Sequence, residues 1–118
     1  MLFFTTGNPE PWYVGVIREG DNLFANSIVA FDLKEKKIKW HFQEIPHDVW
    51  NYDLAAPPIL TMIRRENKLV DVVVVMSKTG NVFILDRESG ETLFDIIYER
   101  APISNVPGER TSPYQINV

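Results

Sequence analysis

The chain has 118 residues, of which 45% are hydrophobic and 24% are charged, and its formal net charge at pH 7 is −4. This length and composition fit one small globular domain and do not fit a disordered chain. No basic cluster is longer than the run 34–37, which a glutamate interrupts, so the composition disfavours nucleic-acid binding. Cysteine is absent, which excludes a disulfide scaffold, a thiolate metal site and a cysteine nucleophile.

The amino-terminal part of the chain predicts a strand, a turn and then a loop. Residues 1–4 are apolar, but this run is far too short for a signal-peptide core or a membrane span, and neither is expected. Residues 2–6 suit a strand, and the glycine and two prolines that follow force a turn. Asn8 precedes a proline, so it should be extended, with its carboxamide projecting from the bend. Residues 12–23 have no clean period and are interpreted as an ordered loop.

The middle of the chain predicts an all-β fold made of antiparallel strands. Apolar and polar residues alternate with period two, β-branched and aromatic residues are frequent, and turn residues stand at the junctions. The expected strands lie near residues 26–33, 37–43, 59–63, 69–76, 81–86 and 91–95. The almost wholly apolar run 69–76 predicts a central strand buried on both faces. From residue 100 on, prolines and small polar residues predict a long loop, and no helix longer than about two turns is expected.

Two segments of the chain resemble each other at an offset of 54 residues, namely 27–40 and 81–94. The residues that fall in register are Asp32 with Asp86 and Trp40 with Phe94. A strand, an aspartate-led turn, a second strand and a terminal aromatic, repeated at this period, are typical of β-propeller blades of four antiparallel strands. The aspartate would fix the turn and the aromatic would wedge between blades. The alternative is two ordinary hairpins that look alike.

The loop 46–53 concentrates polar and aromatic side chains between two predicted strands. The polar side chains in this loop that could bind a ligand or take part in catalysis are His47, Asp48, Asn51 and Asp53. Such crowding on a non-repeating segment is more typical of a site than of a core, although an ordinary surface loop can also carry these residues. We interpret His47 and Asp48 as structural residues that hydrogen-bond within the loop.

Together these segments resemble the quinoprotein dehydrogenases, propeller enzymes that oxidise alcohols or sugars with pyrroloquinoline quinone (PQQ) and a bound metal ion. The stretches that carry the resemblance are Thr6-Gly7-Asn8-Pro9, residues 18–22, Trp40-His41-Phe42-Gln43 running into the loop 46–53, residues 77–80 ahead of 85–87, and residues 106–113. The resemblance implies that residues 1–118 form a single fragment of an eight-bladed propeller, about one and a half to two blades of a longer gene product. It also implies a periplasmic location.

The resemblance assigns site roles to four residues. Asn8 matches an asparagine whose side-chain oxygen binds the metal, and calcium or a lanthanide prefers such hard oxygen ligands. Lys78 matches a basic residue that bonds the quinone oxygens. Asp53 matches an extra carboxylate that can bind a lanthanide in some members, and the alternatives for it are to substitute for the missing base, to bind metal or merely to close the loop. Asn51 stands where the family has the aspartate that is the proposed general base, and a carboxamide cannot serve as a base. Asn51 is also expected among the metal ligands. Taken alone, Asn8 and Lys78 also fit an ordinary turn asparagine and a solvated turn lysine.

The functional expectation is therefore part of a PQQ-dependent dehydrogenase, with hydride transfer from an alcohol or sugar to the quinone and assistance from a metal. The fragment alone should be inactive, because the family takes a glutamate ligand and a tryptophan that stacks on the quinone from preceding sequence. The alternatives are a non-catalytic propeller module for interaction or assembly, and a structural module that closes a ring from several chains. Unpaired strand edges predict that the isolated chain self-associates. The residues do not specify the electron acceptor.

Overall fold

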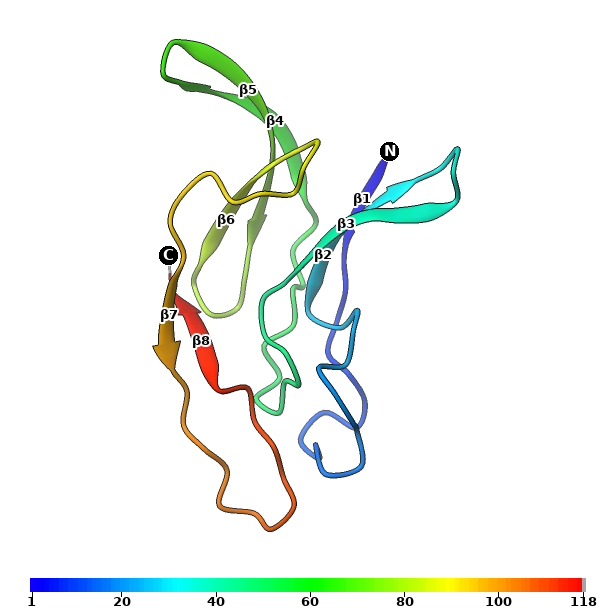
Figure 1. Ribbon diagram of the computed structural model, residues 1–118, viewed down its shortest axis with the longest axis vertical. Helices are drawn as coiled ribbons and strands as arrows, with labels where there is room; N and C mark the ends of the chain where they lie inside the picture. Colours follow the sequence, from blue (N-terminus) through cyan, green and yellow to red (C-terminus); the bar gives the residue numbers. More distant parts are fainter. Residues whose placement is uncertain (118) are drawn as a thin grey trace.

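The computed structural model describes residues 1–117, which contain eight β-strands and no helix (Figure 1). The strands are β1 (Leu2–Thr5), β2 (Ser27–Asp32), β3 (Lys37–Gln43), β4 (Ile59–Arg65), β5 (Lys68–Met76), β6 (Val82–Asp86), β7 (Ile97–Arg100) and β8 (Tyr114–Asn117). They form three antiparallel sheets in the orders β1-β2-β3, β4-β5-β6 and β7-β8. The all-β, antiparallel prediction is confirmed. Among the described residues no helix has the length and apolar character needed to cross a bilayer.

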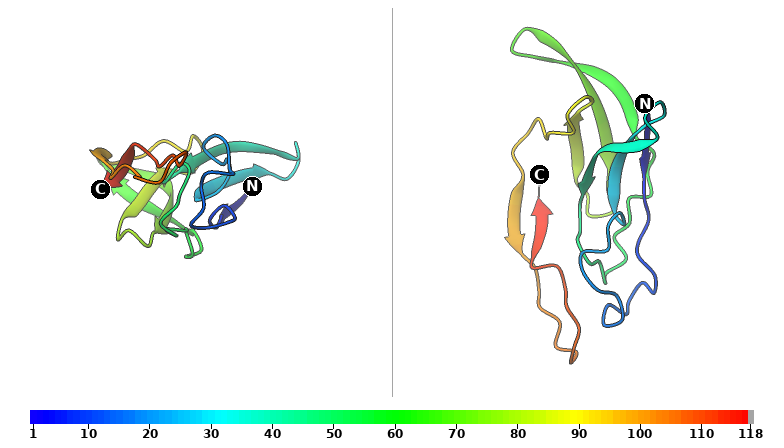
Figure 2. Two further views of the ribbon diagram at one scale, coloured as in Figure 1. Left: turned by 90° about the horizontal axis from the view of Figure 1, so that it is seen from below. Right: turned by 45° about the vertical axis from the view of Figure 1, so that its right-hand side comes forward.

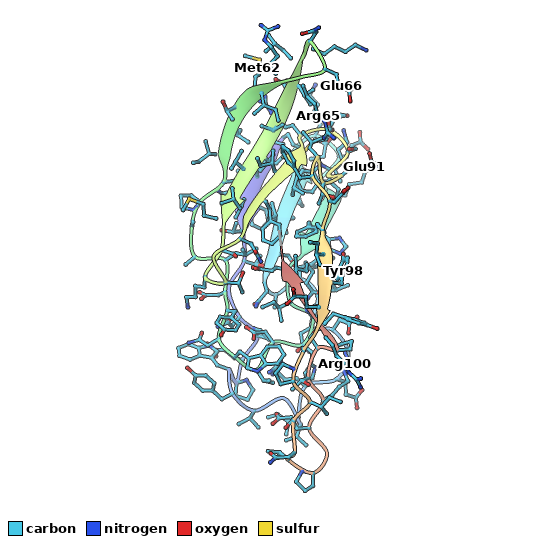
Figure 3. The ribbon with its side chains drawn as sticks, turned by 90° about the vertical axis from the view of Figure 1, so that its left-hand side faces the viewer. Met62, Arg65, Glu66, Glu91, Tyr98 and Arg100 are labelled. Carbon is cyan, nitrogen blue, oxygen red and sulfur yellow. The ribbon has the colours of Figure 1, made fainter. Side chains whose placement is uncertain are left out.

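The strands predicted between residues 26 and 86 are present as β2 to β6, with bounds that shift by at most two residues. The predicted central strand is β5, which pairs with β4 on one side and β6 on the other. Val72 and Val73 are both buried, and because successive side chains point to opposite faces, this half of β5 is covered on both. Leu69 is 62% exposed, since the β4–β5 hairpin projects beyond the sheet (Figures 1 and 3). The prediction of burial therefore holds for residues 72–75 and not for the two ends of the strand, where Met76 is 59% exposed.

The strand predicted at 91–95 is wrong. The segment is tied to β6 by an isolated bridge between Thr92 and Leu85, by a hydrogen bond from the Leu93 amide to the Ile84 carbonyl at 2.9 Å, and by one from the Asp86 amide to the Glu91 carbonyl at 2.8 Å. The Leu93 carbonyl accepts a hydrogen bond from the Arg65 guanidinium instead of continuing a ladder. The segment then bends away from the sheet toward β7.

The long loop predicted from residue 100 on is right for 101–113 and wrong at its end, where residues 114–117 form β8 and pair with β7. The Ala101 amide donates to the Pro113 carbonyl at 3.0 Å and closes the base of this hairpin. Each strand has only four residues, and its partner lies beyond a proline-containing loop. Period-two alternation over so short a run does not identify a strand.

The main hydrophobic core lies between the two three-stranded sheets, which stand side by side (Figure 2). Its buried members are Ile28, Ala30, Trp40, Leu54, Val73, Val75, Phe83, Leu85 and Ile116. The rings of Phe42 and Phe83 meet across the two sheets with their centroids 5.0 Å apart. The three long loops, 6–26, 44–58 and 101–113, gather at the end of the molecule opposite the β4–β5 hairpin (Figure 1).

Asp32 and Asp86, the two aspartates that correspond in the internal repeat, stabilise their turns in the same way. Asp32 Oδ1 accepts the backbone amides two and three residues further on at 2.8 and 3.1 Å, and Asp86 Oδ1 does the same at 2.9 and 2.8 Å. These amide hydrogen bonds, led by that of Glu35 for Asp32 and that of Ser89 for Asp86, lower the pKa of both carboxyl groups. The turns that follow β2 and β6 therefore share one construction.

Trp40 and Phe94, the two aromatic residues that correspond in the internal repeat, have different surroundings. Trp40 is buried, and its Nε1 donates to the Arg87 carbonyl at 3.2 Å in the turn that follows β6. Its ring lies so close to Gly90 that a Cβ there would stand 2.6 Å from the Trp40 Cδ2 atom. Phe94 is 51% exposed, with the Arg65 guanidinium carbon 5.5 Å from its ring centroid. Trp40 thus joins the first sheet to the second, while Phe94 lies at the surface.

Candidate functional site

The four side chains singled out by the sequence line one hollow of about 370 Å³. Asn8 lies in the turn after β1, Asn51 and Asp53 lie in the loop between β3 and β4, and Lys78 lies in the turn between β5 and β6. Three segments that are far apart in the chain therefore meet at this place. The other lining residues are Gly7, Glu10 and Trp12.

Direct contacts connect the four residues. The Asn8 carboxamide donates to Asn51 Oδ1, and Asn51 Nδ2 donates to the Tyr13 hydroxyl at 3.1 Å. Lys78 Nζ forms an ion pair with Asp53 Oδ1 and donates to the Asn51 backbone carbonyl at 3.3 Å. Asn51 has a φ of +65°, a left-handed conformation that asparagine tolerates better than most residues. The four residues thus combine two carboxamides, a carboxylate and an ammonium group, and Glu10 adds a second carboxylate to the lining.

Asp48 gives the loop its shape. This buried carboxylate accepts the Trp50 amide at 2.7 Å with Oδ1, and with Oδ2 it accepts the Tyr52 amide and the Asn26 carboxamide, each at 2.8 Å. These bonds fold the chain on both sides of Asn51 around one anchor. The interpretation of Asp48 as a structural residue that bonds within the loop is confirmed.

His47 is also structural, but the interpretation that it bonds within its own loop is wrong. Its Nδ1 is 2.8 Å from the Gly20 carbonyl oxygen, and its backbone amide donates to the Asp21 carbonyl at 3.0 Å. His47 reaches the neighbouring loop because it has a φ of +50°, which turns the chain toward residues 20 and 21. The loop 6–26 also donates a hydrogen bond to the loop 44–58, from Arg18 Nη2 to the Asp48 carbonyl at 2.8 Å.

The loop 101–113 completes this cluster of loops. Glu109 Oε1 accepts the Gly15 amide at 2.6 Å, and Arg110 Nη2 lies 2.5 Å from Asp21 Oδ1. These contacts join residues about ninety positions apart in the chain. The segment 12–23, predicted to be an ordered loop, is therefore held by the loops on both sides of it.

The oxygen atoms in the hollow fit a hard metal ion. Asn8 Oδ1 is buried and has no hydrogen-bond partner among the described residues. Asp53 Oδ1 is also buried, and it faces Lys78 at ion-pair distance without hydrogen-bond geometry. Carboxamide and carboxylate oxygens are the ligands that calcium-like cations prefer. Within residues 1–117 no group of three His, Cys, Asp or Glu side chains could hold a metal by itself.

Sequence reasoning missed several residues near this site. Glu10, Trp12 and Tyr13 border the hollow or contact Asn51, and their only signal was their proximity to Asn8 in the sequence. Glu44 is the more unusual omission, because it is a buried acid just after β3. Glu44 follows a run in which apolar and polar residues alternate, and this pattern does not indicate that Glu44 is buried.

The fold is that of solved quinoprotein dehydrogenase propellers. It matches the structure of quinohemoprotein alcohol dehydrogenase from Comamonas testosteroni with a TM-score of 0.70 and 34% identity, covering 98% of this chain and 17% of that one. It matches a europium-containing methanol dehydrogenase with a TM-score of 0.72 and 26% identity, covering 94% of this chain and 20% of that one. The chain is thus a fragment of an antiparallel β-propeller.

Sequence comparison identifies the family. The protein-family model described as "Glucose/ethanol/alcohol dehydrogenase, beta-propeller domain" matches residues 1–116. The chain is 41% identical over 92 residues to quinohemoprotein alcohol dehydrogenase of Comamonas testosteroni, covering 76% of the chain and 13% of the relative. It is 31% identical over 110 residues to quinoprotein glucose dehydrogenase of Gluconobacter oxydans, covering 92% and 14%. The chain belongs to the PQQ β-propeller family of glucose, ethanol and alcohol dehydrogenases, and it spans about one seventh of these two curated relatives.

Proposed function

We propose that this chain supplies part of the active site of a PQQ-dependent dehydrogenase that oxidises an alcohol or a sugar with the help of a calcium or lanthanide ion. The observation that carries the proposal is the convergence of Asn8, Asn51, Asp53 and Lys78 on one hollow from three separate segments. Relatives named as alcohol and glucose dehydrogenases support the substrate class. We place the parent protein in the periplasm, as the family resemblance suggests, and expect the 118-residue chain alone to be inactive.

In this proposal, the four side chains predicted from the sequence divide between the metal and the quinone. Asn8, Asn51 and Asp53 would hold the metal through their side-chain oxygens, and Lys78 would bond the quinone oxygens. When bound, the quinone supplies the acceptor for the substrate hydride. The Lys78 ammonium would then stabilise negative charge that develops next to it, in a site where fixed charges are worth more than in water. The Lys78 contacts with Asp53 and with the Asn51 carbonyl support this placement, because they hold the ammonium at the hollow.

Removal of the proton from the substrate hydroxyl is the step for which this chain lacks the expected base. Asn51 occupies the position of the expected base, but a carboxamide has no basic site near neutral pH. Its side chain is already engaged with Asn8 and Tyr13. Asp53 is two residues away and carries a carboxylate. We therefore expect low turnover in the parent protein, with Asp53 as the competing candidate for the base.

Steady-state kinetics of the full-length parent, at saturating quinone and metal, test this account. Asn51→Asp should raise turnover, because general base catalysis is typically worth ~10²–10⁴ in rate. Quinone affinity should change little, since Asn8 and Lys78 are intact in the variant. If Asp53 is already the base, Asn51→Asp changes little and Asp53→Ala abolishes turnover. If neither substitution alters a measurable rate, the catalytic role of this loop is refuted.

A second candidate function is a non-catalytic propeller module that serves interaction or assembly. The observation in its favour is Asn51, which removes the expected base and forms hydrogen bonds that hold two loops together. This candidate predicts that the parent protein binds neither quinone nor metal at the hollow. Saturable quinone binding that requires the metal would exclude it.

A further inference from the structure

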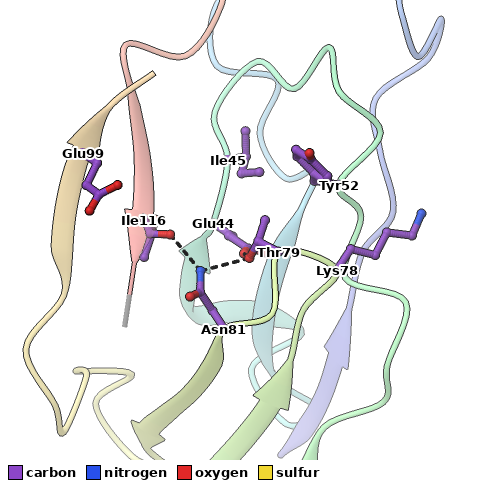
Figure 4. A pocket seen from close by; sticks show the side chains of 8 residues that line it. All are labelled: Glu44, Ile45, Tyr52, Lys78, Thr79, Asn81, Glu99 and Ile116. Carbon is purple, nitrogen blue, oxygen red and sulfur yellow. Dashed lines mark hydrogen bonds between the residues drawn. The ribbon is translucent and has the colours of Figure 1, made fainter. Parts of the chain in front are cut away.

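A second cavity, of about 320 Å³, lies where the three sheets meet (Figure 4). Its lining includes Glu44, Ile45, Tyr52, Thr79, Glu99 and Ile116. Glu44 directly follows β3, Thr79 belongs to the turn between β5 and β6, and the last two residues lie on β7 and β8. A volume of this size is in the range of small-molecule sites, which begins at about 300 Å³.

Glu44 is the chemically unusual residue of this cavity. It is only 2% exposed, and its Oε1 accepts the Thr79 hydroxyl at 2.6 Å. Its Oε2 is buried and has no hydrogen-bond partner within residues 1–117. Burial raises the pKa of Glu44 and the charge of Asp48 adds to this, while side-chain hydrogen bonds from Thr79, Ser77 and Asn81 oppose it. A buried carboxylate oxygen that lacks a donor costs free energy, which a donor-bearing ligand would recover.

The neighbouring hydrogen bonds fix the orientation of this carboxylate. Asn81 Nδ2 donates to Thr79 Oγ1 at 2.9 Å and to the Ile116 carbonyl at 2.8 Å (Figure 4). Because the Thr79 oxygen accepts from Asn81, its hydrogen is available to Glu44 Oε1. Oε1 thus has a donor, and Oε2 is the carboxylate oxygen at the cavity wall that lacks one.

The remaining walls select the ligand class. Tyr52 contributes an aromatic ring, Ile45 and Ile116 contribute aliphatic surface, and Glu99 brings a second carboxyl group. Lys78 also borders the cavity, but its ammonium is held at the other hollow by Asp53, and Figure 4 shows its side chain extending away from Glu44. An acidic group beside apolar and aromatic walls suits an ammonium on a short carbon chain. A bare metal ion would require more oxygen ligands.

We propose that this cavity binds a small organic cation, with its primary ammonium on Glu44 Oε2 and its carbon chain against Tyr52, Ile45 and Ile116. The cavity shares one wall residue, Lys78, with the hollow that contains Asn8 and Asn51, but Glu44 and Ile116 line the cavity and not that hollow. Ligand binding here requires neither the quinone nor its metal, so the proposal does not depend on the proposed function.

Isothermal titration calorimetry of the full-length parent protein with propylammonium chloride at neutral pH tests this proposal. We expect saturable binding at one site per chain, and much weaker binding of propan-1-ol, which has the same carbon chain without the charge. Glu44→Gln removes the charge but retains an acceptor for Thr79, and it should weaken binding by at least about tenfold, the typical effect of losing a charge-assisted hydrogen bond. The matched control is Glu91→Gln, an exposed glutamate in the turn after β6, which should bind as the wild type does.

A second variant and a second readout keep the test decisive. Tyr52→Ala should weaken binding about three- to tenfold through loss of the ring surface that packs against the carbon chain of the ligand. In the wild type, propylammonium should shift the NMR resonances of Thr79 and Tyr52, a readout that needs no variant to fold. The proposal is overturned by absence of saturable heat, by equal affinity for propan-1-ol, by unchanged affinity in a folded Glu44→Gln, or by displacement of propylammonium by equimolar sodium or calcium.

Discussion

The buried carboxyl group of Glu44 makes the stability of the chain depend on pH. Burial raises its pKa above the ordinary value of 4.5, so the folded state holds this proton more tightly than the unfolded state does. Its contribution to the free energy of unfolding is therefore fully present below pH 4.5 and is lost as the pH rises through the raised value.

Urea denaturation of the wild type and Glu44→Gln across this pH window measures the effect. The glutamine does not titrate, so the difference in unfolding free energy between the two proteins should shift in favour of Glu44→Gln as the pH rises. Asp32 and Asp86, whose pKa values are lowered, contribute with the opposite sign, but both proteins share them. Parallel pH profiles for the two proteins would show that Glu44 is not desolvated.

The sequence predicted which residues meet at the hollow better than it predicted how they are held there. Asn8, Asn51, Asp53 and Lys78 belong to motifs with a recognisable order, so their convergence on one hollow could be expected. Their roles as ligands remain proposals. The burial of Glu44 depends on how three sheets pack, and no local pattern in the chain encodes it.

At the scale of elements, the contact between Trp40 and Gly90 joins the first two sheets. Gly90 has a φ of +77°, and a Cβ there would collide with the Trp40 ring. Gly90→Ala should therefore destabilise the chain by the backbone cost of about 1–2 kcal/mol plus a further loss from displacing the indole. Denaturation in urea measures the difference.

Gly80→Ala is the matched control for this prediction. Gly80 also has a positive φ, +88°, but no atom beyond its chain neighbours lies within 4 Å of the position its Cβ would take. This variant should show the backbone cost alone. Equal destabilisation by the two substitutions would contradict the close packing of Trp40 against the turn after β6.

The elements also show where sequence patterns stop being informative. Strands β2 to β6 are long enough for alternation and turn residues to identify them. The segment 91–95 has a strand-like composition, but the guanidinium of Arg65 binds the Leu93 carbonyl and the ladder ends there. The strand β8 depends on pairing with β7 across the loop 101–113, and tertiary pairing of that kind is not visible in four residues.

At the scale of the whole molecule, the sheets have uncovered edges and apolar surface. Exposed hydrophobic side chains occur on β4 and β7, among them Leu60, Met62, Ile97 and Tyr98. Unpaired edges with apolar surface favour association with another chain. We expect the isolated 118-residue chain to self-associate, with a light-scattering mass that rises with concentration. A monomer at all concentrations, with cooperative unfolding, would refute this expectation.

The central claim is that the hollow formed by Asn8, Asn51, Asp53 and Lys78 takes part in holding a metal and a quinone. Its most direct test is equilibrium binding of PQQ to the full-length parent, with and without calcium or a lanthanide. We expect saturable binding that requires the metal. Asn8→Ala and Lys78→Ala should each weaken it by about tenfold or more, as expected for losing a bond to a charged partner. Lys34→Ala, in an exposed turn, should not. Quinone binding that is absent, or that is unaffected by the metal and by both site variants, would contradict the account.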